Sequence, residues 1–110
     1  MALNETKIGL VTEFLEHSFV GCSVDDWEDE EEDSPGRSYR IVDDTSGKLL
    51  HRVFVARAFF DHHAEGEIVP ALQELAVLAC LRIAGSRYVT VRSQMIEIEV
   101  GARSSSPWKS

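Results

Sequence analysis

The sequence predicts an α+β fold of two layers, in which helices cover one face of a small sheet. Residues 5–20 and 68–84 carry apolar side chains at helical spacing. Residues 38–43 and 49–60 are rich in strand-forming residues and flank a strong turn signal. Residues 87–100 alternate as a strand does. The expected order is therefore helix–hairpin–helix–strand (αββαβ), with an antiparallel or mixed sheet of about three strands and helices on one face.

The two predicted helices differ in how much of their surface is apolar. In residues 5–20, Ile8, Val11 and Leu15 form one apolar stripe, and Gly21 supplies a natural end. Residues 68–84 are apolar on nearly every side, which is typical of a helix that is buried on more than one side. We therefore expect either the first helix or another subunit to cover the outer face of the second.

Residues 44–47 read Asp-Thr-Ser-Gly, which favours a tight turn and makes the two flanking strands a β-hairpin. Arg40 and Arg52 could face each other across this hairpin. The second strand, residues 49–60, is apolar on both faces, which is typical of a central strand.

The apolar alternation in residues 87–100 changes phase. Val89 and Val91 are apolar at odd positions, whereas Ile96 and Ile98 are apolar at even positions. Because a slip of one residue moves every side chain to the other face, we predict a β-bulge near residues 93–94. Two short strands with a bend are the alternative. Residues 1–100 are expected to form a single domain, and the Ser-rich residues 101–110 a disordered tail.

The negative charge is concentrated in one segment. The formal net charge is -8, and residues 25–33 hold eight of the 19 acidic residues, so the other 11 balance the 11 Lys and Arg. Because such a block repels itself, residues 22–37 are predicted to form a mobile acidic loop. We consider this loop a candidate docking segment with an aromatic anchor, made of Asp25, Asp26, Trp27, Glu28, Asp29, Glu30, Glu31, Glu32 and Asp33. A passive, solvated loop is the alternative.

Composition excludes several classes of function. The chain lacks the basic footprint that non-specific nucleic-acid binding requires. Its most apolar stretch is too short and too polar to span a bilayer, so no membrane contact is expected and a cytoplasmic location is the default. No Walker A, Gly-x-Gly-x-x-Gly or zinc pattern occurs, so we expect no cofactor.

The densest group of chemically active side chains lies where the second strand meets the second helix. Asp61, His62, His63 and Glu65 are metal-ligand and acid–base types, and His51 in the hairpin could join them. The alternative is a polar turn in which Asp61 or His63 caps the following helix.

Three functional hypotheses follow. The leading one is a non-enzymatic protein-interaction module that self-associates, for example as a homodimer, and docks a partner through the acidic loop. The second is a metal-binding protein or small hydrolase centred on residues 61–65. The third is a partner subunit of a nucleic-acid regulator, which would need a basic face assembled from Arg37, Arg40, Arg52 and Arg57.

Overall fold

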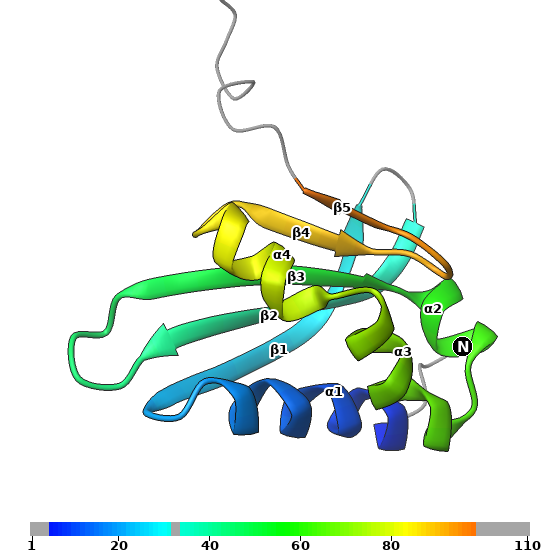
Figure 1. Ribbon diagram of the computed structural model, residues 1–110, viewed down its shortest axis with the longest axis horizontal. Coiled ribbons are helices and arrows are strands. Elements are labelled where there is room, and N and C mark those ends of the chain that lie inside the picture. Colours follow the sequence, from blue (N-terminus) through cyan, green and yellow to red (C-terminus); the bar gives the residue numbers. More distant parts are fainter. Residues whose placement is uncertain (1–4, 32–33, 99–110) are drawn as a thin grey trace, which may run out of the picture.

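The computed structural model describes residues 5–31 and 34–98. A five-stranded mixed sheet forms one layer, and helices pack on one of its faces (Figure 1). This arrangement confirms the α+β class. The strand number differs from the prediction, because the order β1-β2-β3-β4-β5 contains five strands where about three were expected.

The described residues form ten elements. The helices are α1 (Glu5–Ser18), α2 (Arg57–His62), α3 (Ile68–Glu74) and α4 (Val77–Ala84), with a short 3₁₀ helix, η1 (Glu65–Glu67). The strands are β1 (Cys22–Glu31), β2 (Ser34–Asp43), β3 (Leu49–Ala56), β4 (Tyr88–Val91) and β5 (Ile96–Ile98). All neighbouring strands run antiparallel except β3 and β4, which are parallel and are connected through α2, η1, α3 and α4.

The core lies between the helices and the sheet. Val11 and Leu15 of α1 are buried in it, as the apolar stripe predicted. Tyr39 lies beneath α1, and its hydroxyl donates a hydrogen bond to the Ile8 carbonyl at 3.2 Å. Burial is the main cause that raises the pKa of Tyr39, followed by the Asp26 carboxylate, so the phenol stays protonated.

The predicted hairpin is present as β2 and β3, and Arg40 is opposite Arg52. In its turn, the Gly47 N–H donates to the Asp43 carbonyl at 2.8 Å with Gly47 at a φ of 74°. The Asp43 carboxylate accepts hydrogen bonds from the hydroxyl and the N–H of Ser46, and these bonds lower the pKa of Asp43.

The predicted second strand ends earlier than expected, at Ala56, and continues as helix α2. Phe59 and Phe60 are both buried in the same core. Adjacent residues of a strand point to opposite faces, so a strand could not bury both side chains on one side of the sheet. A helical turn can.

The predicted second helix is broken into α3 and α4. Ala76 separates them in a left-handed conformation with a φ of 57°. A straight helix that is apolar all round could not turn every side toward one core. The break re-orients the two halves, so that Ile68 and Leu72 of α3 and Leu81 of α4 all reach the core.

The predicted last strand is two short strands, β4 and β5, joined by a tight turn. The Arg92 N–H donates to the Met95 carbonyl at 2.8 Å. The turn explains the phase change, because Val91 and Ile96 are paired across it and both pack at the core. The predicted bulge is therefore wrong, and the alternative of two strands with a bend is confirmed. The expected tail, residues 101–110, lies outside the described residues.

The predicted acidic loop, residues 22–37, is the largest correction. Cys22–Glu31 form the ten-residue strand β1, and residues 34–37 begin β2. The two strands pair antiparallel, with Trp27 opposite Ser38. Self-repulsion is overcome because β2 supplies arginines to the acidic strand, as described below.

Candidate functional site

The side chains of residues 61–65 lie together in sequence but do not converge on one point. Nδ1 of His63 cannot bind a metal ion in this arrangement, because it donates a hydrogen bond to the Phe59 carbonyl at 2.9 Å. The rings of His62 and His63 have centroids 5.9 Å apart. Asp61 faces back along α2, where its carboxylate is 3.5 Å from Nε of Arg57. Glu65 is exposed at the start of η1.

His51 is remote from these residues. His51 lies near the start of β3, whereas His62 ends α2, which follows that strand. The five residue steps from His51 to Ala56 span about 17 Å along the strand. His51 Nδ1 lies 2.9 Å from the Gly85 carbonyl, and its ring packs against Phe19 at a centroid distance of 5.0 Å. These contacts give His51 a packing role between α1, β3 and the end of α4.

Neither Asp61 nor His63 caps the next helix, in contrast to the alternative drawn from the sequence. The Glu67 carboxylate performs the local stabilisation instead, accepting a hydrogen bond from the Ala64 N–H at 3.0 Å. Within residues 5–31 and 34–98, no group of three or more His, Cys, Asp or Glu side chains is arranged to hold a metal ion.

Three aspartates of β1 are bonded to side chains of β2, on both faces of the sheet. On the helix-covered face, Asp26 accepts a hydrogen bond from Nε of Arg37 at 2.8 Å, and both side chains are only about a quarter exposed. On the opposite face, Asp25 pairs with Arg40 at 3.0 Å. There too, Asp29 accepts a hydrogen bond from the fully buried Ser38 hydroxyl at 2.7 Å.

β1 is an edge strand. In the part of the chain that the structure describes, β2 pairs with one of its sides and no strand pairs with the other. Glu28 and Glu30 are exposed on it, and Trp27 retains 37% of its exposure. An edge strand presents a row of backbone N–H and C=O groups that another chain can pair with. β1 therefore combines an open backbone edge, exposed carboxylates and an aromatic side chain.

The four arginines proposed for a basic face do not gather on one surface. Arg37 and Arg40 lie on opposite faces of β2, each against a carboxylate of β1. Arg52 stacks over Tyr88 at 4.4 Å and donates to the Ser86 carbonyl at 2.7 Å. Arg57 lies against Asp61. Three of these four cations are paired with carboxylates, which removes the excess positive charge that phosphate binding needs.

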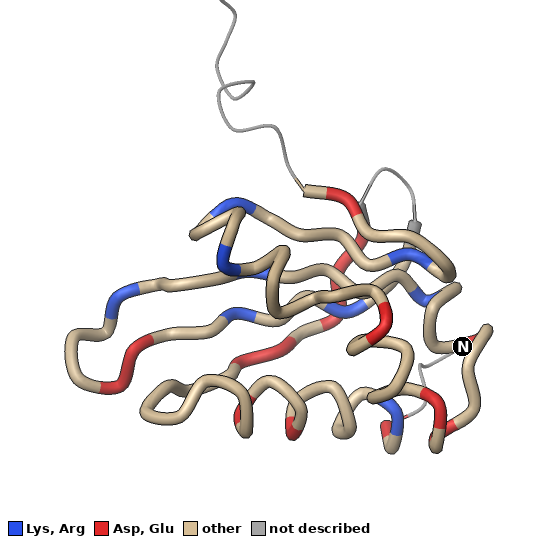
Figure 2. The backbone as a smooth tube through the Cα atoms, in the orientation of Figure 1, with Lys and Arg blue, Asp and Glu red and all other residues tan. Residues whose placement is uncertain are grey.

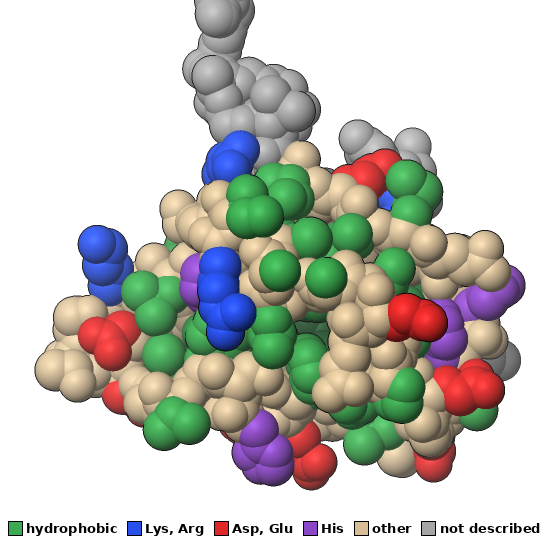
Figure 3. All heavy atoms as spheres, viewed as in Figure 1, with side chains coloured by type: hydrophobic (Ala, Val, Ile, Leu, Met, Phe, Trp, Pro, Cys, Tyr) green, Lys and Arg blue, Asp and Glu red, His purple; other side chains and the backbone are tan. Residues whose placement is uncertain are grey.

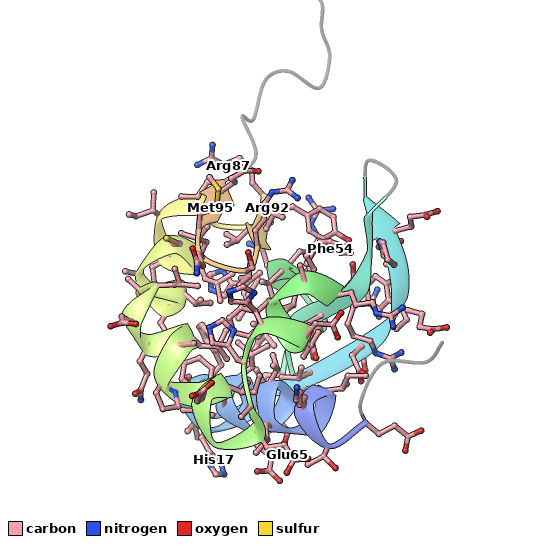
Figure 4. All side chains as sticks on the ribbon, turned by 90° about the vertical axis from the view of Figure 1, so that its right-hand side faces the viewer. His17, Phe54, Glu65, Arg87, Arg92 and Met95 are labelled. Atoms are coloured by element: carbon pink, nitrogen blue, oxygen red, sulfur yellow. The ribbon has the colours of Figure 1, made fainter. Side chains whose placement is uncertain are left out.

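The charges of the fold are polarised across the sheet. Residues 5–31, which form α1 and β1, contain nine acidic residues and one basic residue, Lys7. At the opposite edge, α4 carries Arg82 and Arg87 lies between α4 and β4. Arg92 lies in the turn between β4 and β5, where it pairs with Glu97 of β5 at 3.2 Å. Figure 2 shows this contrast. Figure 4 places Glu65 and Arg87 at opposite ends of the molecule. The register places carboxylates along one edge strand, and sequence reasoning missed this because the pairing partner of the acidic run was unknown.

Comparison of the chain with family models, with curated proteins and with solved structures finds no match. No helix among the described residues is long and apolar enough to cross a bilayer.

Proposed function

We propose that this protein is a non-catalytic protein-interaction module that binds an extended, basic segment of a partner protein along β1. The observation that carries the proposal is that the acidic run coincides with the open edge of the sheet. Addition of a strand to a sheet edge takes its affinity from main-chain hydrogen bonds and its specificity from alternate side chains. Because β1 carries carboxylates, an added strand with cationic side chains is favoured.

The charge of β1 also opposes its pairing with a second copy of itself. Six of its ten residues are acidic, so two β1 strands side by side would bring carboxylates together. Like charges directly opposite each other destabilise a strand pair. A basic segment of another protein would instead place cations opposite these carboxylates, which stabilises a strand pair. Because such segments are common in nucleic-acid-binding proteins, this proposal includes the role of a partner subunit in a nucleic-acid regulator.

The test is a titration of the protein with a fluorescent ten-residue peptide that alternates Lys and Val. We expect saturable binding that weakens with salt. Replacing Glu28 and Glu30 by Gln should weaken binding about tenfold, because each carboxylate contributes on the order of 0.7 kcal/mol. The matched control replaces Glu5 and Glu65, which are exposed outside β1, and should leave the affinity nearly unchanged.

A second peptide separates strand addition from simple charge attraction. It has the same number of lysines, with proline in place of valine, so half of its backbone positions lack an N–H. We expect it to bind at least tenfold more weakly if its segment must pair with β1. Equal binding of the two peptides, or no effect of the Glu28 and Glu30 changes, contradicts the proposal.

A further inference from the structure

Helix α4 has an apolar outer face that none of the other described elements covers. Val77 and Leu81 point to the core, whereas Ala79 and Ile83 are exposed, Ile83 at 70%. The first helix, which could have covered this face, packs against α3, β1 and β2. The sequence predicted that either α1 or another subunit covers the outer face of the second helix. In the described part of the chain, α1 does not cover the outer face of α4.

Opposite charges stand on either side of this apolar face. Glu74 ends α3 and Arg82 lies in the last turn of α4, and both are exposed. Figure 2 shows the acidic and basic positions on either side of the α3–α4 junction. In Figure 3, hydrophobic side chains lie between a basic group and an acidic group on this side of the molecule. Because Glu74 precedes α4 and Arg82 lies near its end, an antiparallel second copy of α4 would bring the acidic end of one copy toward the basic end of the other.

We propose that α4 forms a homodimer interface, in which α4 of a second copy packs antiparallel against it near Ala79. A two-fold interface uses the same patch on both subunits, so the patch must complement itself. Here Glu74 of each copy meets Arg82 of the other, and the two contacts are equivalent. The small side chain of Ala79 lets the helices approach closely, and Ile83 is buried against the second copy.

This inference is independent of the proposed partner site. β1 and the β4–β5 edge beside α4 are at opposite ends of the sheet order. A dimer through α4 therefore leaves β1 open in both subunits. Peptide binding and dimerisation can each fail without the other failing.

The test is sedimentation velocity at about 100 μM protein, a concentration suited to a small interface with a micromolar dissociation constant. We expect the unmodified protein to sediment as a dimer. Ile83→Asp should give a monomer, and because Ile83 is largely exposed, thermal unfolding should show that the fold remains. A monomeric unmodified protein overturns the proposal.

Charge exchange identifies the surface and the symmetry. Glu74→Arg alone places two arginines together at both contacts, and Arg82→Glu alone places two glutamates together, so each variant should be monomeric. An equimolar mixture of the two should dimerise again, because every arginine then meets a glutamate. Recovery in the mixture supports the two-fold arrangement. Dimers that persist in both single variants, or a mixture that stays monomeric, overturn it.

Discussion

Replacing Gly36 by valine is expected to destabilise the protein by roughly 3 kcal/mol. Gly36 lies in β2 opposite Ala56. A Cβ atom at this position would be 2.4 Å from the Val55 carbonyl oxygen and 2.5 Å from the Phe54 ring. Since one of these neighbours is backbone, the clash cannot be relieved by a rotamer change alone. Phe54 itself has no exposed surface, so its ring has little room to move.

The measurement is the free energy of unfolding from denaturant titration. Gly9 in α1 is the matched control, because nothing lies within 4 Å of a Cβ added there. Gly9→Ala should stabilise the protein by about 0.5–1 kcal/mol, since glycine is unfavourable inside a helix. A Gly36→Val variant as stable as the unmodified protein would show that the ring of Phe54 does not lie over β2 (Figure 4).

Replacing residues 25–30 by alternating Gly and Ser is expected to cost roughly 3–5 kcal/mol. Three glycines weaken the strand, the partly buried pair between Asp26 and Arg37 is lost, and the apolar contact of Trp27 is removed. Ser38 would also lose the Asp29 carboxylate that accepts its buried hydroxyl. A loop, by contrast, would tolerate the same replacement with little change in stability.

The control for this replacement removes charge but keeps the strand. Asp25 and Asp26 form ion pairs with arginines of β2. Glu28 and Glu30 form no such ion pair with the described residues, and both side chains are exposed. Changing these two residues to Thr should leave stability unchanged or raise it slightly, because Thr favours strands and the like charges are removed. If the Gly-Ser replacement were as stable as this control, the assignment of residues 25–30 to a strand would be wrong.

Periodicity predicted the parts of the fold in which one local signal is sufficient. The stripe that contains Val11 and Leu15 specified α1, and residues 44–47 specified the hairpin turn and its register. Each of these signals is contained within a short stretch of neighbouring residues. They do not depend on which segment becomes the neighbour.

The elements that sequence reasoning missed depend on distant partners. β1 is unfavourable by charge and by strand propensity, and its formation relies on Arg37 and Arg40 in the next strand. The alternation Asp25, Trp27, Asp29 on one face is visible in the sequence, but like-charge repulsion outweighed it in the prediction. The break at Ala76 could not be predicted either, because an alanine with positive φ has no sequence signature.

The prediction of a chemical site at residues 61–65 with His51 was limited for the same reason, because such a site depends on distant parts of the fold. Adjacent histidines are conspicuous in a sequence, but their ring nitrogens are directed by the backbone around them. His63 is bound to α2 and His51 to the end of α4, so the two are committed to different parts of the fold. The pairing of β1 with β2, together with the strand order, shows that the acidic run forms an edge strand. Counting charges in the sequence could not show this.

Hydrogen exchange of the backbone amides of residues 23–30, followed by NMR, tests most directly whether the acidic run is an edge strand. In an antiparallel edge strand, alternate residues donate to the neighbouring strand and the others point outward. We therefore expect slow and fast exchange to alternate along β1, with the slow amides facing β2. Uniformly fast exchange of all these amides would show a solvated loop, and would remove the structural basis for partner binding along β1.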